Sequence, residues 1–576
     1  MENAEIARLF YETADLMEIA GEDSFRIRSY RNGATAIESH PERVSDMVQD
    51  ASRDVTTIQG IGKGLAAVLK EIVERGSFAR RDEMLARYPP TALELLKIQG
   101  LGPKSIALLY QHYRVSTIDD LERICREGKL RLLPRMGEKL EQKVLRSIES
   151  YRRSASRFLI NFADRVASEL AAYLAETPGV ERVTPAGSLR RGKETIGDVD
   201  LLVTGPAPAP ALERFAAFPR VKEILARGGN KTSASIGHEG LQVDVRVLDR
   251  SSYGSAMQYF TGSKDHNVAL RQRALRLGFT LSEYGLFRVD DQSKVAGETE
   301  EEIYDRLGLA WIPPELRENL GEIEAAAEGR LPELVRLDQI RGDLHMHTVE
   351  TDGRYSIAEM AQAARAAGYQ YLAITDHSKA LAMANGLDET RLLAQVAEIR
   401  RVAGDFPDLT IFAGVECDIR QDGAMDLADD ALAQLDVVIA SVHSYLNQEP
   451  AQMTDRLLRA IENPHVDILG HPTGRLLLRR DGYPFDFERV AAAAARHSVH
   501  FEINASPERL DLGSQLLRMA RAQGARFVIS TDAHHIKHLD NMKYGVWTAR
   551  RAWLGPADIV NTLDPEGFRG ALRKPS

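Results

Sequence analysis

The spacing of apolar residues divides the chain into three stretches of different character. Up to about residue 155, apolar positions repeat every three or four residues and β-branched runs are few, which predicts a helical region. From about residue 180, short apolar runs such as GDVDLLV (197–203) and LQVDVRVL (241–248) predict strands. After residue 340, apolar strand-like runs alternate with alanine-rich helical runs, which is the pattern of a βα-barrel.

Composition and charge indicate a globular cytoplasmic protein. Of its 576 residues, 44% are hydrophobic and 27% charged, and no apolar run is long enough to span a bilayer. The N-terminus is acidic where a signal peptide carries basic residues, and the two cysteines, Cys125 and Cys417, supply no disulfide framework. The net charge of −10 argues against a uniformly basic nucleic-acid binder, but residues 97–157 hold 14 Lys and Arg against 7 Asp and Glu. We therefore expect no membrane contact and a polyanion bound by that basic segment.

Two helical hairpins in the N-terminal region share one pattern. In TTIQGIGKGLAAVLKEIVERG (56–76) and LLKIQGLGPKSIALLYQHY (95–113), a Gly-apolar-Gly turn and a basic residue separate two apolar helices. Glycine allows φ > 0 and close approach of a backbone, and a helix N-terminus directs free N–H groups at a phosphate. For a single copy, a helical packing corner is the alternative. The repeats resemble the helix-hairpin-helix motif of DNA repair proteins, which implies sequence-independent DNA contacts. The residues concerned are Gly60, Gly62, Lys63, Gly100, Gly102 and Lys104.

Three aspartates indicate a site of a different kind. Asp198 and Asp200 alternate in an apolar strand and share a face, and Asp244 in a similar strand can lie beside them. Carboxylates packed together repel one another unless divalent ions that prefer oxygen ligands, such as Mg²⁺ or Mn²⁺, lie between them. A Gly-Ser turn at 187–188 and the Arg pair at 190–191 can hold phosphate. The alternative is a solvated edge strand with a charged face, but the combination in this order favours phosphoryl transfer.

The same residues carry a resemblance to a known superfamily. Gly187-Ser188 followed by Asp198-x-Asp200 resembles the nucleotidyltransferase signature of the DNA polymerase β superfamily. The stretch YFTGSKDHNVALRQRALRLGFTLSEYGLF (259–287) resembles the nucleotide-binding part of X-family DNA polymerases. The resemblance implies a palm that binds gapped or primer-template DNA and deoxynucleoside triphosphates, with the three aspartates as catalytic metal ligands. The residues implied to bind the nucleotide are Gly187, Ser188, Arg191, Tyr259, Phe260, Gly262, Asn267 and Arg271.

The helical N-terminus resembles the lyase domain of the same family, with one departure. The position of the Schiff-base lysine falls on Val68, which cannot act as a nucleophile, and neither Lys63 nor Lys70 is in register. Deoxyribose-phosphate lyase activity is therefore not expected, whereas Arg26, Tyr30 and Lys63 are expected to bind the 5′ end of a gap.

Histidines are concentrated after residue 340, where 11 of the 15 lie. Six predicted strands there end in ligand-type residues, and a βα-barrel places its chemistry at the C-terminal ends of its strands. A single such histidine is more often structural, but nine candidates of mixed imidazole and carboxylate type favour a cluster of two or three Zn²⁺, Mn²⁺ or Fe²⁺ ions. The candidates are His345, His347, Asp352, His377, Glu416, His443, His471, Asp532 and His534.

This set of ligands resembles that of the PHP (polymerase and histidinol phosphatase) family over residues 340–576. In bacterial X-family polymerases such a domain is associated with 3′-5′ exonuclease and abasic-site endonuclease activity, and the resemblance implies the exonuclease here and leaves the endonuclease open. A fused small-molecule phosphatase and a metal-stabilised scaffold are the alternatives. The remaining histidines are interpreted as structural (His465, His497 and His500) or as candidate phosphate contacts (His535 and His538).

The expected fold is therefore multidomain, with α+β and α/β parts, and the protein is expected to act as a monomer. The predicted parts are a lyase-like helical DNA-binding domain (1–85), a second helix-hairpin-helix subdomain (86–155), a polymerase β-like nucleotidyltransferase palm (156–250), a nucleotide-selecting subdomain (251–313), a polar connector with some helix (314–339) and a PHP domain with a distorted βα-barrel (340–576).

Overall fold

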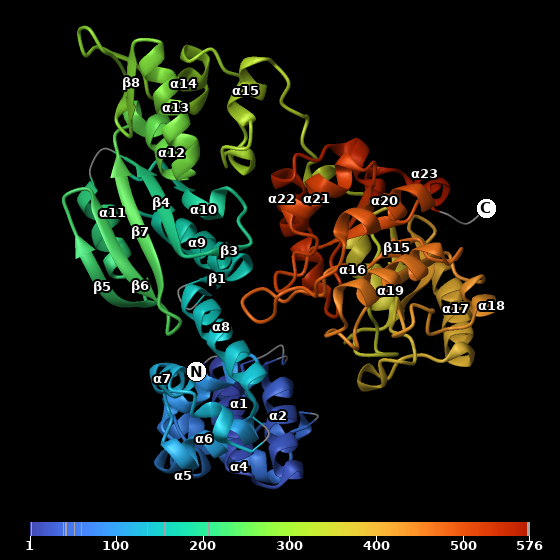
Figure 1. The fold of residues 1–576 in the computed structure, drawn as a ribbon. Helices are drawn as coiled ribbons and strands as arrows, with labels where there is room; N and C mark the ends of the chain where they lie inside the picture. The colour runs from blue at the N-terminus through green and yellow to red at the C-terminus, as the bar shows by residue number, and fades with distance from the viewer. Residues whose placement is uncertain are drawn as a thin grey trace. The chain divides into compact units, whose positions relative to one another are not determined.

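The computed structural model describes the chain except residues 2, 39, 41–42, 51, 59, 135, 155–156, 206–207 and 573–576. It divides into two compact units, residues 1–156 and residues 157–576 (Figure 1). The first unit is helical, whereas the β-sheets of the described chain all lie in the second. Within the described ranges, no helix combines the length and the apolar character that crossing a bilayer requires.

The helices of the first unit pack around one apolar core that runs through both hairpin repeats. They are α1 (Asn3–Ile19), α2 (Ser24–Glu38), α3 (Val44–Gln49), α4 (Lys63–Arg75), α5 (Ala79–Arg87), α6 (Pro103–Tyr113), α7 (Ile118–Arg126) and α8 (Glu138–Ser154). Phe10, Tyr30 and Phe78 form an aromatic cluster at the centre, with ring centroids 5.5 to 5.9 Å apart. The helical character expected for this region is confirmed.

The second unit begins with a five-stranded sheet whose two central carboxylate-bearing strands are parallel. In spatial order the strands are β2 (Arg182–Pro185), β4 (Asp198–Thr204), β7 (Leu241–Leu248), β6 (Lys231–Ile236) and β5 (Val221–Arg227), and only β4 and β7 pair in parallel. Val199, Leu201 and Val203 of β4 pack in one cluster with α9 (Ile160–Ala175) and α11 (Pro208–Ala216). Because side chains alternate along a strand, Asp198 and Asp200 lie on the opposite face of β4.

That opposite face is covered by two short helices that carry residues of the predicted nucleotide motifs. They are α10 (Gly187–Arg190) and α12 (Tyr253–Thr261), and both contact β4. Leu202 packs there with Ala256 and Met257 of α12. A two-stranded pairing of β1 (Phe158–Leu159) with β3 (Thr195–Ile196) holds the loop after α10 against the start of α9. The Gly-Ser motif and the aspartates thus lie on one side of the sheet.

A smaller subdomain follows the sheet (Figure 1). Its elements are α13 (Lys264–Arg276), β8 (Phe279–Ser282), β9 (Gly285–Arg288), β10 (Lys294–Ala296), α14 (Glu300–Arg306) and α15 (Glu322–Ala327). Leu316, Ile323 and Leu334 belong to the same apolar cluster as Leu270 and Ile303. The connector expected over 314–339 does contain helix, but it packs into this subdomain and is not an extended spacer.

The last part of the chain is a seven-stranded parallel sheet. The strands, neighbours in chain order, are β11 (Gly342–Asp343), β12 (Tyr371–Ile374), β13 (Thr410–Asp418), β14 (Val437–Ser441), β15 (Ile468–Leu469), β16 (His500–Asn504) and β17 (Phe527–Ser530). A parallel bridge between Met346 and Ala533 joins the first strand to the last, so that the sheet nearly closes on itself. The βα-barrel expected from the sequence is confirmed.

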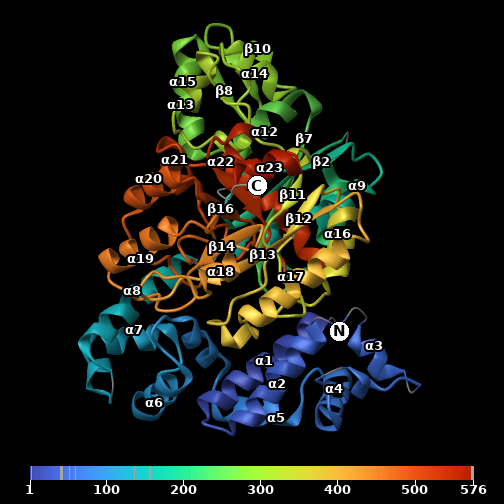
Figure 2. The same cartoon turned by 90° about the vertical axis from the view of Figure 1, so that its right-hand side faces the viewer.

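Helices surround the barrel and fill one of its ends. Outside the strands (Figure 2) lie α16 (Ile357–Ala366), α17 (Glu389–Ala403), α18 (Asp429–Leu432), α19 (Pro450–Glu462), α20 (Phe487–His497), α21 (Ser514–Ala522) and α22 (Met542–Arg551). Phe568 of α23 (Pro565–Ala571) stacks on Tyr371, the first residue of β12, with ring centroids 5.0 Å apart. Apolar side chains therefore fill the end at which the strands begin, and the polar site lies at the other end.

Candidate metal centres and nucleotide-binding site

The nine candidate ligands of the barrel lie at the C-terminal ends of its strands. His345 and His347 follow β11, and Asp532 and His534 follow β17, its neighbour through the Met346–Ala533 bridge. The others are Asp352 in the loop after His347, His377 after β12, Glu416 within β13, His443 after β14 and His471 after β15. Five of the nine are buried (His345, His347, His377, Glu416 and His471), three are half-buried, and Asp352 is exposed. The structure thus brings together the residues that the sequence pattern selected.

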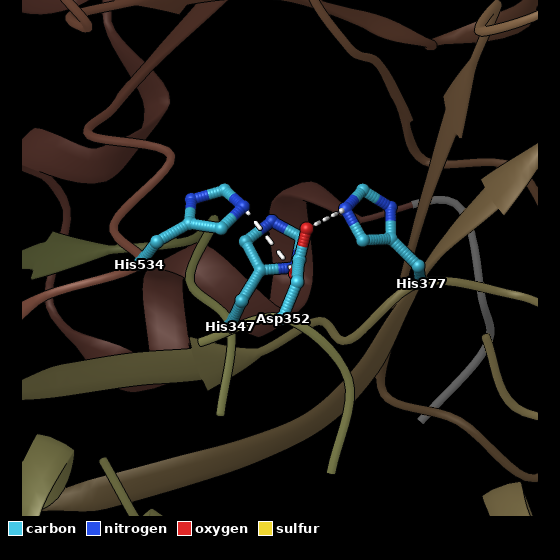
Figure 3. Close-up of side chains that lie close together, drawn as sticks. All are labelled: His347, Asp352, His377 and His534. Atoms are coloured by element: carbon cyan, nitrogen blue, oxygen red, sulfur yellow. Dashed lines mark ion pairs between the residues drawn. The ribbon is translucent and has the colours of Figure 1, made fainter. Parts of the chain in front are cut away.

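The candidate ligands form three groups, and within each group the ligand atoms all lie within 4.8 Å of one another. The groups are His347 with Asp352, His377 and His534; His345 with His347 and Asp532; and His377 with Glu416 and His443. In the first group, Asp352 lies between two imidazoles, and its carboxylate oxygens are each 3.4 Å from a histidine Nε2 (Figure 3). His347 is shared by the first and second groups, and His377 by the first and third. Shared ligands are what a cluster of adjacent ions requires.

Glu416 lies at the centre of the cluster. Its Oε2 is 2.8 Å from His377 Nδ1 and 3.4 Å from His345 Nε2, and its Oε1 is 2.8 Å from His471 Nε2. One carboxylate therefore faces imidazoles from several strands with both oxygens. This is the arrangement of a carboxylate that bridges two ions.

Several buried atoms of the cluster lack a hydrogen-bond partner among the described residues. They are His345 Nε2, His347 Nδ1, His377 Nδ1, His471 Nδ1 and Glu416 Oε2. An unsatisfied buried polar atom costs about 1–3 kcal/mol, so a folded chain rarely keeps five at one place without a ligand. The donor set of imidazole and carboxylate fits Zn²⁺, Mn²⁺ or Fe²⁺.

Charges within the cluster raise the pKa of several of its imidazoles, among them His345, His377 and His443. Burial opposes the charge on His377, but the carboxylates of Glu416 and Asp352 outweigh it and raise the pKa of His377 to about 10. In the same way, Glu416 and Asp418 overcome burial and raise the pKa of His443 to about 9. Burial and the neighbouring imidazoles His534 and His377 lower the pKa of His347 to about 4. At neutral pH the chain without metal therefore holds protons where a metal ion needs neutral imidazole.

Metal binding is accordingly expected to release at least two protons per chain at pH 7, because His377 and His443 must lose theirs and the pKa of His345 is also raised well above its ordinary value. Metal affinity should rise with pH up to about 10, above which His377 and His443 are both neutral. Titration calorimetry of chelator-treated protein with Mn²⁺, in two buffers of different ionisation enthalpy, measures the proton number. Binding heats that are the same in both buffers would contradict the expectation.

The sequence reasoning missed the carboxylates that orient these ligands. Glu502, on the strand β16 that carries no predicted ligand, accepts a hydrogen bond from His345 Nδ1 at 2.6 Å and one from the backbone N–H of His471 at 2.6 Å. Asp418 accepts from His443 Nδ1, and Asn504 Nδ2 donates to Asp532 at 3.1 Å. Such partners fix the orientation of an imidazole ligand. The available signal was a single carboxylate inside the apolar strand HFEIN (500–504).

Three of the other histidines of the barrel part, His500, His535 and His538, lie in two places. His500 Nε2 lies 3.0 Å from the carbonyl of Ala571, near the filled end of the barrel, which agrees with its interpretation as structural. His535 and His538 follow the ligand His534, and His535 Nε2 lies 3.2 Å from the hydroxyl of Tyr355. His538 Nδ1 accepts from the backbone N–H of His534 at 3.3 Å. These two therefore lie at the rim of the metal cluster.

The three aspartates of the palm come together as expected. Asp200 and Asp244 are register partners on the parallel strands β4 and β7, and Asp198 lies two residues before Asp200 on the same face. A Cβ built on Gly187 would lie 3.0 Å from Asp200 Oδ2, and Gly187 has φ = +64°, so glycine is needed at this turn. Among the described residues, however, the tight ligand groups all belong to the barrel, and the aspartates are more widely spaced.

Electrostatics separates the roles of two of these carboxylates. Burial, together with the charges of Asp198 and Asp244, raises the pKa of Asp200 to about 7. Burial acts in the same direction on Asp244, but a hydrogen-bonded ion pair with Lys231, 2.5 Å from Oδ2, lowers its pKa below the ordinary value. Divalent cations beside Asp200 would relieve this repulsion, so the carboxylate set fits an oxygen-seeking ion.

Of the predicted phosphate contacts, Gly187 and Ser188 lie beside Asp200, whereas the side chain of Arg191 is paired elsewhere. Gly187 and Ser188 open α10 directly over Asp200. The guanidinium of Arg191 instead pairs with Glu318, with Nε 3.1 Å from Oε1, and donates to the carbonyl of Thr261. Its neighbour Arg190 forms two hydrogen bonds with Glu300. In this structure the guanidinium of Arg191 thus pairs with Glu318 in the place of the expected phosphate.

The other predicted nucleotide contacts gather at the end of α12. Tyr259 and Phe260 are half-buried and lie edge to face, with centroids 5.0 Å apart. Gly262 has φ = +70°, and a Cβ there would lie 3.1 Å from Arg191 Nη1. The amide of Asn267 is buried and bonded to the carbonyl of Tyr259 and to Gln258, and Arg271 donates to the carbonyl of Asn267. Asn267 therefore buttresses Tyr259 and offers little free amide to a base.

In the first unit, the two hairpins have matching turns. Gly60 and Gly100 have φ of +95° and +96°, as expected, whereas Gly62 and Gly102 are extended N-caps of α4 and α6. A Cβ on Gly62 or on Gly102 would meet nothing within 4 Å. Packing inside the chain thus does not require glycine at either position, which leaves room for the close approach of a ligand.

Arg26 and Tyr30, which are expected from the sequence to bind the 5′ end of a gap, differ in their exposure. Arg26 is exposed, but Tyr30 is 8% exposed and stacks on Phe78, so it belongs to the core, and the expectation that it contacts DNA is not supported. Val68 packs half-buried against the core of this unit, and Lys63, the first residue of α4, is exposed.

Family models match most parts of the chain. They are a helix-hairpin-helix domain at residues 1–78, a SAM-like helix-hairpin-helix tandem at 92–150, the DNA polymerase beta thumb at 256–318 and the PHP domain at 343–506. Together with the two sites, these matches define a polymerase β-like nucleotidyltransferase joined to a PHP domain.

The similarity to known proteins assigns the chain to one family within this class. A protein of Bacillus subtilis, "DNA polymerase/3′-5′ exonuclease PolX", is 39% identical over 575 residues, which cover all of both chains. The chain therefore belongs to the PolX family of bacterial X-family DNA polymerases. A probable phosphatase of Thermoanaerobacter is 32% identical over 231 residues, 38% of this chain and 89% of its own. Among solved structures, Leishmania infantum polymerase beta in a ternary P/T complex matches 40% of this chain and 98% of its own, at 22% identity and a TM-score of 0.27.

Proposed function

We propose that this chain is a DNA-directed DNA polymerase that fills short gaps during DNA repair, and that its PHP domain shortens DNA 3′ ends and incises abasic sites. It is proposed to act as a cytoplasmic monomer. The observation that carries the proposal is the presence of two separate metal-type sites, one of carboxylates and one of imidazoles, in a chain whose full length matches a polymerase/exonuclease. The proposal assigns synthesis to the carboxylate site and hydrolysis to the imidazole site.

In the palm, Asp198 and Asp200 are proposed to hold two Mg²⁺ or Mn²⁺ ions, and Asp244 to complete one site beside the primer 3′-hydroxyl. The ions supply charge that lowers the pKa of the attacking hydroxyl and stabilises the leaving pyrophosphate. The chain's own contribution is to orient the reactants. Register pairing fixes Asp200 against Asp244, and the Lys231 ion pair keeps Asp244 ionised as a ligand or proton acceptor.

The nucleotide is proposed to lie between α10 and the end of α12. Gly187 and Ser188 supply a backbone N–H and a hydroxyl, and Arg191 supplies positive charge, for the triphosphate. Tyr259, Phe260 and Gly262 are proposed to face sugar and base. The remaining two contacts proposed from the sequence are Asn267 at the base edge and Arg271 at the template strand, and the buried bonds of Asn267 favour an indirect role through Tyr259.

The hairpins are proposed to hold the DNA backbone through Gly60, Gly62, Lys63, Gly100, Gly102 and Lys104. The open space at the N-caps of α4 and α6 supports this, because a phosphate can approach the helix N-terminus. Lyase activity is not part of the proposal, since Val68 has no amine.

Replacing Lys63 and Lys104 together with alanine is expected to weaken binding of unrelated DNA sequences to the same extent. The slope of log affinity against log salt should fall by about two, one for each lost phosphate contact. Fluorescence anisotropy with two gapped duplexes at several salt concentrations measures it. Lys222→Ala removes an exposed lysine from strand β5 and is the matched control, which should keep the wild-type slope. A loss confined to one DNA sequence would contradict phosphate reading.

In the barrel, the nine ligands are proposed to hold two or three Zn²⁺, Mn²⁺ or Fe²⁺ ions, which supply a nucleophilic hydroxide and bind the scissile phosphate. Glu502 and Asp418 orient His345 and His443 for this task. His535 and His538 at the rim are proposed to contact phosphate. A small-molecule phosphatase is not favoured, because the relative from Thermoanaerobacter with that name matches only 38% of the chain, whereas the relative that matches the full length is named as a polymerase/exonuclease.

Gap filling and 3′ degradation on one labelled, one-nucleotide-gapped duplex test the proposed function. With Mg²⁺ or Mn²⁺ and a deoxynucleoside triphosphate, the wild-type chain should extend the primer by the templated nucleotide. With Mn²⁺ and no triphosphate, it should shorten the primer from its 3′ end. Rapid hydrolysis of a small phosphomonoester without any shortening of DNA would assign the barrel to a phosphatase instead.

A further inference from the structure

Helix α22 of the barrel packs directly on the polymerase palm. Asp164 of α9 accepts hydrogen bonds from Lys543 Nζ at 2.6 Å and from the hydroxyl of Tyr544 at 2.9 Å. Gly192, with φ = +64°, lies so close that a Cβ there would be 3.0 Å from the Cβ of Trp547. The loop that follows the Gly-Ser motif is thus held by a helix from the other catalytic domain.

Arg551, the last residue of α22, reaches into the proposed triphosphate site. Its Nη1 donates to the backbone carbonyl of Arg191 at 2.9 Å and to Glu318 Oε1 at 2.9 Å. Its side chain is only 9% exposed. Arg551 therefore contacts both the backbone that ends α10 and the carboxylate that pairs with the Arg191 side chain.

Glu318 is surrounded by more positive charge than it can balance. Its Oε1 is 3.1 Å from Arg191 Nε and 3.7 Å from Lys193 Nζ, in addition to the contact with Arg551. Burial alone would favour the neutral acid, but Arg551 and Arg191 outweigh it and hold the pKa of Glu318 below its ordinary value. The group thus consists of three cations and one carboxylate in a largely buried place, and the excess of two positive charges suits a polyanion.

We propose that Arg551 is a positioning residue for nucleotidyl transfer, through which the barrel domain prepares the triphosphate site of the polymerase. The inference rests on the proposed function. Because Arg551 also pairs with Glu318, the ion pair between Glu318 and Arg191 is weaker. Arg191 can then release this carboxylate and bind a triphosphate at a smaller cost in free energy. It also fixes the Arg191 carbonyl, and with it the end of the short helix that presents Gly187 and Ser188.

Without Arg551, Glu318 would bind Arg191 more tightly. The backbone carbonyl of Arg191, at the end of α10, would also lose its hydrogen-bond donor. Both effects act on the binding of the triphosphate and not on the aspartates that carry the reaction. The KM for the deoxynucleoside triphosphate should therefore rise more than kcat falls. Loss of a hydrogen bond to a charged group corresponds to roughly a tenfold rise in KM.

The test is steady-state filling of a one-nucleotide gap by the full-length chain, with the triphosphate concentration varied. Arg551→Ala is expected to raise KM about tenfold and to change kcat less than about threefold, with 3′ degradation as in the wild type. Arg551→Lys, which retains the charge but loses the length and planar geometry of the guanidinium, should give an intermediate KM. The matched control is Arg365→Ala, which removes a barrel arginine paired only with Asp408 in the described contacts and should leave KM unchanged.

A wild-type KM in Arg551→Ala would overturn the inference, as would a fall in kcat alone. If Arg551→Ala lowers both the unfolding midpoint and the rate of 3′ degradation, the test is repeated with Arg551→Gln. Glutamine keeps part of the side-chain volume and a hydrogen-bond donor but carries no charge. An unchanged KM in that variant would equally overturn the inference. A wild-type chain that adds no nucleotide to the gap contradicts the proposed function itself, whereas normal filling with an unaltered KM in the variants contradicts only the role of Arg551.

Discussion

Replacing Asp200 with alanine is expected to lower gap filling by roughly a thousandfold or more while 3′ degradation continues at the wild-type rate. Burial and the charges of Asp198 and Asp244 raise the pKa of Asp200 to about 7, so Asp200 is the carboxylate of the palm site that depends most on a bound cation to be fully ionised. The nine barrel ligands belong to other strands of another sheet. Primer extension and degradation on the same gapped duplex measure both activities side by side.

The Asp200 variant is not expected to lose stability. A buried acid whose pKa lies above its unfolded value stabilises the folded chain only at low pH, and that contribution is lost as the pH rises toward 7. Removing Asp200 should therefore leave the unfolding midpoint at pH 8 unchanged or raise it. Asp249→Ala, an exposed aspartate just after β7, is the control and should retain both activities. Parallel loss of extension and degradation in Asp200→Ala would refute the division between the two sites.

Replacing His345 with alanine is expected to do the reverse, with 3′ degradation reduced roughly a thousandfold and gap filling retained. His345 is fully buried, its Nδ1 is held by Glu502, and its Nε2 faces both Glu416 and Asp532. Its loss removes a proposed metal ligand and one of the imidazoles that face these carboxylates. Metal analysis of the purified variant should show fewer bound ions than the wild type.

The matched control for this variant is His465→Ala, which removes a histidine that lies before β15 and outside the cluster. It should retain both activities and the wild-type metal content. If His345→Ala shortened DNA 3′ ends as fast as the wild type, the barrel would be a scaffold and the degradation would have to come from elsewhere.

The barrel ligands could be predicted because each depends on local rules. An apolar run ending in a histidine or carboxylate identifies both a strand and its functional end, and the same rule placed His377, His443 and His471 without knowledge of their neighbours. Alternation along β4 likewise put Asp198 and Asp200 on one face. Both sites therefore followed from periodicity and residue type.

Other features depend on contacts between distant residues, which periodicity does not describe. Glu502 could be recognised as a polar residue in an apolar strand, but its partner His345 lies 157 positions earlier. The pairing of Arg191 with Glu318 spans 127 positions and replaces the free cation that the motif implies. Tyr30 and Asn267 matched family positions, yet burial uses their side chains for packing and internal hydrogen bonds.

The bridge between Met346 and Ala533 has a consequence for how the protein is made. The palm aspartates are complete once residue 244 has been synthesised, but His345 and His347 need Asp532 and His534, which are translated almost last. Because domains fold during synthesis from the N-terminus onward, a nascent or prematurely terminated chain ending before β17 lacks the closing strand of the barrel. A damaged message would thus yield a product that binds DNA but has no assembled metal cluster with which to degrade it.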